Sequence, residues 1–220
     1  MFSTTRGILL VTLFCILMVS IGSAALFSGN KEKGIDQIPP INVSCVGDSI
    51  TEWSGYPTIL QTMLGDSYEV GNFGVAGAAV SPSLHNSYVS HSEFNESKNF
   101  APSIVIIMLG TNDVHTSQSD FTYNYRKLVL EYKSLPSYPR ILLVEPPPIY
   151  DNEFKLNNTY LDSYVIPSIE RIAYELGLPM VDVNGALANH PEFFEDGVHP
   201  NAKGALAIAS EIVENIGFEN

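Results

Sequence analysis

The chain has 220 residues, 45% of them apolar, which is enough for one substantial hydrophobic core and too few for two ordinary domains. Its formal net charge of −13 excludes a surface built to bind phosphate backbones or anionic lipid head groups, since such contacts need Lys and Arg. We therefore expect one acidic domain with no nucleic-acid partner.

The N-terminal segment differs from the rest of the chain. The stretch GILLVTLFCILMVSIGSAALF carries no charge, has an apolar centre of the length of a signal-peptide core, and ends in small residues suited to cleavage. Its whole length is also just sufficient for a retained membrane anchor. Residues 1–27 are predicted to be a signal peptide or an N-terminal membrane anchor, followed by a linker (28–40) and a domain (41–220). That domain is expected to be secreted or anchored to the outer face of the membrane.

Five short runs rich in β-forming residues follow the linker. They span residues 41–46, 68–73, 103–109, 140–145 and 179–183. Two of them, IVIIML and ILLV, lack polar alternation, as strands buried on both faces of a parallel sheet do. Helical patterns fill the gaps, so the chain consists of repeated right-handed βαβ units. This predicts the α/β class, with a three-layer α/β/α sandwich around a five-stranded parallel sheet.

The helical segments between these runs have identifiable ends. Pro57 suits a first turn, and Gly65 suits the left-handed end of the same helix. Apolar residues recur at helical spacing over 121–135 and 161–176. Pro167 interrupts the second pattern, and because proline inside a helix costs about 3 kcal/mol, we expect a kink or a restart there.

Polar motifs follow the predicted strands. GDS (47–49), NFGVAG (72–77) and GTND (110–113) come directly after the first three strands, and DGVHP (196–200) lies near the C terminus. In open α/β sheets, ligands bind outside the carboxyl ends of the strands. We therefore expect the four motifs to meet on one rim of the sheet.

The residue types in these motifs fit acyl transfer through a nucleophilic serine. A serine hydroxyl needs a neighbouring base, and that base needs a carboxylate to fix its tautomer, so we predict Ser49 as nucleophile, His199 as base and Asp196 as its partner. For the oxyanion we predict the N–H groups of Ser49 and Gly74 and the amide of Asn112 as donors. Taken singly, each residue also fits a cap, a turn or a loop hydrogen bond. Their joint order at the strand ends favours catalysis.

In these four motifs the sequence resembles the SGNH hydrolases of the GDSL esterase superfamily, over most of residues 41–217. The resemblance implies a flavodoxin-like fold of five parallel strands and the same roles for the five site residues. The stretches VIIMLGTNDV and HPEFFEDGVHPNAKGALAIA are similar to members grouped with sialate and other carbohydrate O-acetylesterases. The expected function is a serine esterase that removes short acyl groups, in particular acetyl groups, from carbohydrates through an acyl-enzyme.

Other functions remain open from the sequence. The same triad could deliver the acyl group to a glycan acceptor, or serve a lysophospholipase or thioesterase, and a non-enzymatic binding module would retain the motifs without turnover. An α/β-hydrolase is disfavoured because Ser49 does not lie in a G-x-S-x-G elbow. We expect no cofactor and no metal, since the other histidines lack ligand spacing. The expected partner is a small-molecule or glycan ester, with membrane contact only through an uncleaved N-terminal segment.

Further residues near the motifs are candidates for substrate binding. They are Asp48, Glu52, Trp53 and Asp113. For Glu52 and Trp53, ordinary helix packing is an equal alternative. The loop from Pro146 to Asn158 could border the cleft or be a plain surface connection, and the Ser-rich stretch 81–99 is expected to be an insertion on the catalytic side.

Overall fold

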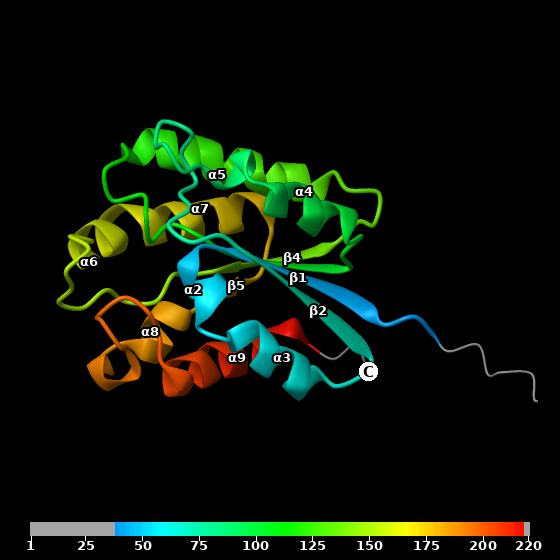
Figure 1. Ribbon diagram of the computed structural model, residues 1–220. Helices are drawn as coiled ribbons and strands as arrows, with labels where there is room; N and C mark the ends of the chain where they lie inside the picture. The colour runs from blue at the N-terminus through cyan, green and yellow to red at the C-terminus, as the bar shows by residue number, and fades with distance from the viewer. Residues whose placement is uncertain (1–37, 218–220) are drawn as a thin grey trace, which may run out of the picture. The chain divides into compact units, whose positions relative to one another are not determined.

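The computed structural model describes residues 38–217, which are built around a five-stranded parallel sheet (Figure 1). The strands are β1 (Ile41–Gly47), β2 (Tyr68–Gly74), β3 (Ile104–Met108), β4 (Arg140–Val144) and β5 (Met180–Val181). Their order is β2-β1-β3-β4-β5, the flavodoxin-like arrangement, and every pairing is parallel. The five predicted strands are confirmed, although β5 is shorter than expected.

Helices cover both faces of this sheet. Over one face lie α4 (Ser92–Asn99), α5 (Gln118–Lys133) and α7 (Ile166–Leu176), and over the other lie α3 (Tyr56–Leu64), α8 (Val183–Leu187) and α9 (Ala202–Ile216) (Figure 1). Shorter helical segments occupy the connections: α2 (Ser49–Trp53), η1 (Tyr88–Ser90), α6 (Asn158–Tyr160), η2 (Leu161–Val165) and η3 (Pro191–Phe193). The predicted three-layer sandwich is therefore confirmed.

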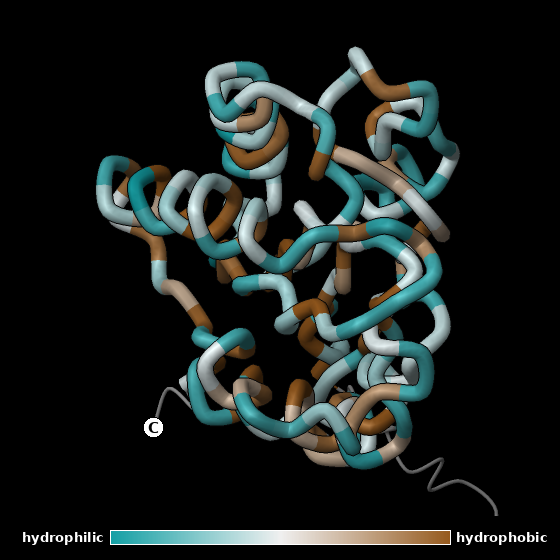
Figure 2. The backbone as a smooth tube through the Cα atoms, turned by 90° about the vertical axis from the view of Figure 1, so that its left-hand side faces the viewer, coloured by the Kyte–Doolittle hydropathy of each residue, from teal (hydrophilic) through white to brown (hydrophobic). Residues whose placement is uncertain are grey.

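Each face of the sheet has its own apolar core. The central strand β3 is buried along its whole length, and its alternate residues serve opposite cores: Val105 and Ile107 face α5 and α7, whereas Ile106 and Met108 face α9. Figure 2 views the carboxyl ends of the strands, where the surrounding loops are mostly hydrophilic and the hydrophobic segments lie further inside. The rim at which the sequence predicts the functional motifs is therefore polar, whereas the interior of the sandwich is apolar.

Pro167 marks a restart of the helical pattern, as expected. The residues before it form a π-helical turn, η2, and Pro167 lies in the first turn of α7. Proline is tolerated there because the first-turn N–H groups have no intrahelical partner.

The prediction that the stretch 81–99 is an insertion on the catalytic side is wrong for the second half of this stretch. Its second half contains η1 and α4, and α4 is the crossover helix between β2 and β3. Tyr88 and Phe94 are buried in the core, so this segment completes a layer of the sandwich. The sequence SEFNESKN conceals the helix because only one narrow face of it is buried.

Within residues 38–217, no helix is long and apolar enough to cross a membrane. The predicted signal peptide or anchor (1–27) and most of the predicted linker (28–40) lie outside the residues that the structure describes.

Candidate active site

The short helix α2 positions Ser49 at the carboxyl end of β1. Asp48 caps this helix, because its Oδ1 accepts a hydrogen bond from the Ile50 N–H at 3.0 Å, so the Ser49 side chain is left for another partner. Gly47 precedes them because a Cβ there would overlap the Thr51 side chain. Burial is the main cause that raises the pKa of Asp48 to about 6. With 1% of its surface exposed, Asp48 supports α2 and does not reach a substrate.

Ser49, His199 and Asp196 form one hydrogen-bonded chain. Ser49 Oγ lies 3.0 Å from His199 Nε2, and His199 Nδ1 lies 2.7 Å from Asp196 Oδ2. Because Nδ1 faces a carboxylate, it is the ring nitrogen that holds the proton in the neutral imidazole, which leaves Nε2 to accept from the hydroxyl. The structure thus brings together three residues that the sequence separates by up to 150 positions.

The turn that carries Asp196 and His199 is fixed by hydrogen bonds. Burial alone would raise the pKa of Asp196, but bonds from the backbone and ring of His199 and from the Val198 N–H outweigh it and hold the pKa below its ordinary value. Gly197 adopts a φ of 82°, and its carbonyl accepts from the Tyr150 N–H at 2.8 Å. A Cβ on Gly197 would collide with the Asp151 carbonyl, so glycine lets these two loops touch.

Asn112 lies beside the Ser49 turn. Its Nδ2 donates to the Ala78 carbonyl at 3.0 Å and lies 3.4 Å from Asp48 Oδ2. An amide nitrogen carries two hydrogens, so the short contact engages one, and the other is held only by the long contact to Asp48. This second hydrogen is the one available to a reacting oxygen.

Gly74 packs directly against α2. A Cβ on Gly74 would lie 2.3 Å from the backbone nitrogen of Glu52, so only glycine allows β2 to end here. The Gly74 N–H donates to Asn72 Oδ1 at 3.0 Å, while Asn72 Nδ2 donates to the Glu52 carbonyl at 3.3 Å. Sequence reasoning missed the contact of Asn72 with this N–H, although an Asn two residues before a Gly is the pattern of an Asx-turn.

Asp113 lies behind the site. It is fully buried, and its two carboxylate oxygens each accept a backbone N–H at 3.0 Å, from Val80 and from Ser81. Burial is the main cause that raises its pKa to about 7. Asp113 therefore anchors the loop after β2, and its predicted contact with substrate is contradicted by its burial.

Glu52 and Trp53 have different surroundings although they are neighbours. The Glu52 carboxylate accepts the backbone N–H of Ala76, which ties α2 to the loop after β2. Trp53 is 61% exposed, and its ring centroid lies 5.4 Å from that of His199. Of the four candidate substrate-binding residues, Trp53 is therefore the one whose side chain lies open beside the imidazole.

Phe154 is a site residue that the sequence did not single out. It is 53% exposed, and its ring lies edge-on to His199 with centroids 5.4 Å apart and planes at 88°. Trp53, Phe154 and His199 line a hollow of about 340 Å³. The signal in the sequence was an aromatic residue within the polar stretch DNEFKLNN. The sequence alone does not show that this residue lies next to His199.

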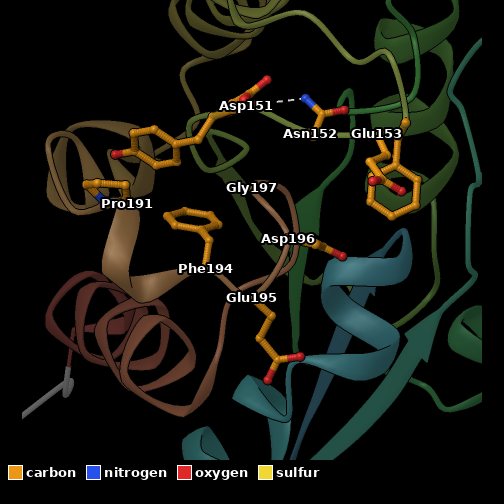
Figure 3. Close-up of a pocket in the computed structure, with 10 residues that line it drawn as sticks. Asp151, Asn152, Glu153, Pro191, Phe194, Glu195, Asp196 and Gly197 are labelled. Carbon is orange, nitrogen blue, oxygen red and sulfur yellow. Dashed lines mark hydrogen bonds between the residues drawn. The ribbon is translucent and has the colours of Figure 1, made fainter.

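A larger hollow of about 600 Å³ adjoins the first. Figure 3 shows Asp151, Asn152 and Glu153 on one wall and Phe194, Glu195 and Asp196 on the other. The hollows share Phe154, Glu195 and Asp196 among their lining residues, so together they extend the site away from Ser49. Across residues 38–217, no three His, Cys, Asp or Glu side chains are grouped to hold a metal ion.

Comparison with protein families gives a match over most of this domain. The model of the GDSL-like Lipase/Acylhydrolase family matches residues 45–207, which include every member of the hydrogen-bonded chain. An acetylxylan esterase of Xylanibacter ruminicola is 29% identical over 206 residues, covering 80% of this chain and 43% of that protein. The GDSL esterase/lipase CPRD49 of Arabidopsis thaliana is 26% identical over 136 residues, covering 51% and 53%. The chain spans about half the length of the curated relatives it matches.

Solved structures share the fold. A carbohydrate acetylesterase family member from Sinorhizobium meliloti superposes with a TM-score of 0.67 at 22% identity, covering 80% of this chain and 98% of the other. A catalytic mutant of Axe2, an acetylxylan esterase from Geobacillus stearothermophilus, superposes with a TM-score of 0.64 at 25% identity, covering 83% and 97%. The α/β/α fold around this site is therefore shared with solved esterase structures.

Proposed function

The chain belongs to the GDSL-like lipase/acylhydrolase family, and we propose that it is a serine esterase that removes acetyl groups from carbohydrates. The observation that carries this proposal is the chain of short contacts from Ser49 through His199 to Asp196. A hydroxyl, an imidazole and a carboxylate in that order are the parts that nucleophilic ester cleavage requires.

In the first half of the reaction, Ser49 Oγ attacks the carbonyl carbon of the ester. His199 Nε2, 3.0 Å away, takes the hydroxyl proton, so the imidazole becomes positively charged. Asp196 remains ionised because hydrogen bonds hold its pKa low, and it stabilises this charge through Nδ1. The imidazolium then gives the proton to the sugar oxygen as the C–O bond breaks, leaving the acetyl group on Ser49.

The negative oxygen of the tetrahedral intermediate needs donors that are already in place. The Ser49 N–H lies in the first turn of α2, where no intrahelical acceptor exists, and the second hydrogen of the Asn112 amide is weakly engaged. The Gly74 N–H is occupied by Asn72 Oδ1 in the free protein. The oxyanion therefore shares that N–H or replaces the Asn72 oxygen when it forms.

In the second half, water replaces the sugar. His199, neutral again, takes a proton from the water, whose oxygen attacks the acetyl carbon. Collapse of the second intermediate returns the proton to Ser49 Oγ and releases acetate. No step needs a group beyond these side chains, the N–H donors and water.

The substrate class is supported by two kinds of observation. The relatives described above include an acetylxylan esterase and a carbohydrate acetylesterase family member. The ester site opens into exposed aromatic and polar surface at Trp53 and Phe154, which suits a sugar better than a long acyl chain. For localisation, the uncharged N-terminal stretch supports secretion or attachment to the outer face of a membrane.

The test is acetate release from acetylated xylo-oligosaccharides by the full-length protein, with the Ser49→Ala variant as control. We expect turnover by the unmodified protein, none above background by the variant, and stoichiometric labelling of Ser49 by a serine-directed phosphonate. Transfer of acetyl to an added glycan in preference to water would instead identify an acyltransferase. A strong preference for octanoate over acetate esters would reject the acetyl-ester assignment, and absence of both turnover and labelling would reject the esterase.

A further inference from the structure

Two adjoining hollows extend the ester site toward the loops after β4 and β5. The hollow next to His199 has a volume of about 340 Å³, and its neighbour has about 600 Å³. Phe154, Glu195 and Asp196 belong to both, so the two form one groove that begins at the imidazole. The first hollow has the volume of a small ligand site, and the second gives room for more than one sugar unit.

Aromatic rings stand at the start of this groove. Trp53 and Phe154 flank the His199 ring, each with a centroid distance of 5.4 Å, and they are 61% and 53% exposed. Exposed apolar side chains that are grouped, as these two are around one imidazole, are typical of a ligand-binding groove, whereas singly exposed ones are ordinary. The apolar C–H face of a sugar ring packs on such surfaces while its hydroxyls stay hydrated or hydrogen-bonded.

Among residues 38–217, the groove is lined by four acidic residues and by no Lys or Arg. Its four acidic residues are Asp151, Glu153, Glu195 and Asp196. Lys155 and Lys203 are close in sequence to the lining residues, but neither lines a hollow. Carboxylates accept hydrogen bonds from sugar hydroxyls, and their combined field repels an anionic ligand.

From these observations we propose that the groove binds the sugar chain on the leaving-group side of the ester, and that it accepts neutral oligosaccharides while rejecting chains that carry carboxylates. The catalytic part of this inference rests on the proposed esterase function. The binding part does not, because it follows from the aromatic rings, the two hollows and the charge of their lining.

The electrostatic potential in the groove can be measured without any turnover. Trp53 is the single tryptophan of the 220-residue chain, so the tryptophan fluorescence of the protein reports on this groove alone. Its fluorescence in the full-length protein should be quenched more efficiently by caesium ions than by iodide, relative to a free tryptophan amide. The triple variant Asp151→Asn, Glu153→Gln, Glu195→Gln should raise the iodide quenching constant of Trp53 about twofold at moderate salt, because it removes three screened negative charges from the lining of the groove.

A matched control separates the local field from the net charge. The triple variant Glu69→Gln, Glu96→Gln, Glu131→Gln removes the same number of charges at exposed positions in β2, α4 and α5. We expect this control to leave the iodide constant within experimental error. Equal quenching by caesium and iodide in the unmodified protein, or an equal response of the two triple variants, would overturn the proposed field.

Ligand binding is tested with the same fluorophore in the Ser49→Ala variant, which cannot consume an ester. Xylotetraose should change the Trp53 emission with saturation, whereas tetragalacturonate should bind at least about tenfold more weakly, since its negative charges meet carboxylates. The difference should shrink in 0.5 M NaCl. The proposal would be overturned if tetragalacturonate bound as tightly as xylotetraose. It would also be overturned if neither sugar changed the Trp53 emission.

Kinetics distinguish failure of this inference from failure of the esterase. Acetylated xylotetraose should be hydrolysed with a kcat/KM at least about tenfold above that of acetylated tetragalacturonate. The groove triple variant should lower the ratio of kcat/KM for the neutral substrate to that for the anionic one. The control triple variant should leave this ratio unchanged. Equal kcat/KM values for the two acetylated oligosaccharides would reject the proposed selectivity of the groove and leave the esterase function standing. Absence of hydrolysis of any ester would reject the esterase function, and the fluorescence measurements would still test the groove.

Discussion

The candidate site has two halves that are built in different ways. The half beside β1, β2 and β3 is closed: Asp48 and Asp113 are 1% and 0% exposed, and each binds backbone N–H groups. The other half, formed by the loops after β4 and β5 together with Trp53 of α2, is open: Trp53 and Phe154 are exposed, as are the acidic residues of the loops. Under the proposed function, the closed half holds the reacting groups in place and the open half selects which ester binds.

Ser49 and His199 join the two halves, so breaking this pair should have the largest effect. We expect Ser49→Ala to lower kcat for acetate release roughly 10⁴-fold or more, because the proposed nucleophile is lost while the fold is kept. Ser137→Ala, at an exposed position, is the matched control and should retain full rate. Substantial activity in folded Ser49→Ala protein would contradict the assignment of the nucleophile.

Asn112 tests the closed half. Asn112→Ala removes a proposed oxyanion donor, and we expect kcat to fall about 10²- to 10³-fold with a smaller change in KM. The amide also holds the Ala78 carbonyl, so thermal unfolding should be measured alongside the kinetics. Asn95→Ala, on the exposed side of α4, is the control. A fall in kcat of less than tenfold would indicate that Asn112 only positions the loop.

The contrast between the halves also explains how much the sequence predicts. In the closed half, Gly47 and Gly74 have no room for a Cβ, and Asp48 must cap α2. These positions tolerate few residue types, so the motifs can be recognised in the sequence. The strands, the meeting of the motifs on one rim and the hydrogen-bonded chain through Ser49 were therefore predictable.

The contacts of the open half could not be predicted from the sequence in the same way. Phe154 reaches His199 because the loop after β4 lies against the turn at Gly197, a contact between segments about 45 residues apart that no local pattern encodes. The buried roles of Asp48 and Asp113 were missed for a related reason. A carboxylate in a motif looks the same whether it faces a substrate or a backbone N–H.

Asp113 tests whether the closed half depends on its buried carboxylate. Asp113→Ala leaves the N–H groups of Val80 and Ser81 without their acceptor, and we expect the free energy of unfolding to fall by about 1–3 kcal/mol. Chemical denaturation monitored by circular dichroism measures this. Asp120→Ala is not a suitable control because it binds Ser81, whereas Asp66→Ala, exposed between α3 and β2, is suitable.

The pH dependence of stability gives Asp113 a second test. Its pKa is raised from 3.8 to about 7, so the folded state binds the proton more tightly than the unfolded state does. Its contribution to stability is therefore fully present below about pH 4 and is lost as the pH rises through about 7. Asp113→Asn cannot titrate, so the unfolding free energy of the variant should decline less between pH 5 and pH 8. Parallel curves for the two proteins would contradict the raised pKa.

The smallest effect is expected in the open half, where Phe154 is replaced by Ala. Loss of one exposed aromatic contact is worth about 0.5–1.5 kcal/mol, which corresponds to roughly a 2- to 12-fold rise in KM for an acetylated oligosaccharide. The rise should be larger for the oligosaccharide than for 4-nitrophenyl acetate, because the small ester does not extend into the groove. Tyr174→Ala, on the 89%-exposed tyrosine of α7, is the control and should change neither value. If Phe154→Ala lowered kcat for both esters equally with KM unchanged, Phe154 would act by orienting His199, and selection would have to reside elsewhere in the loops.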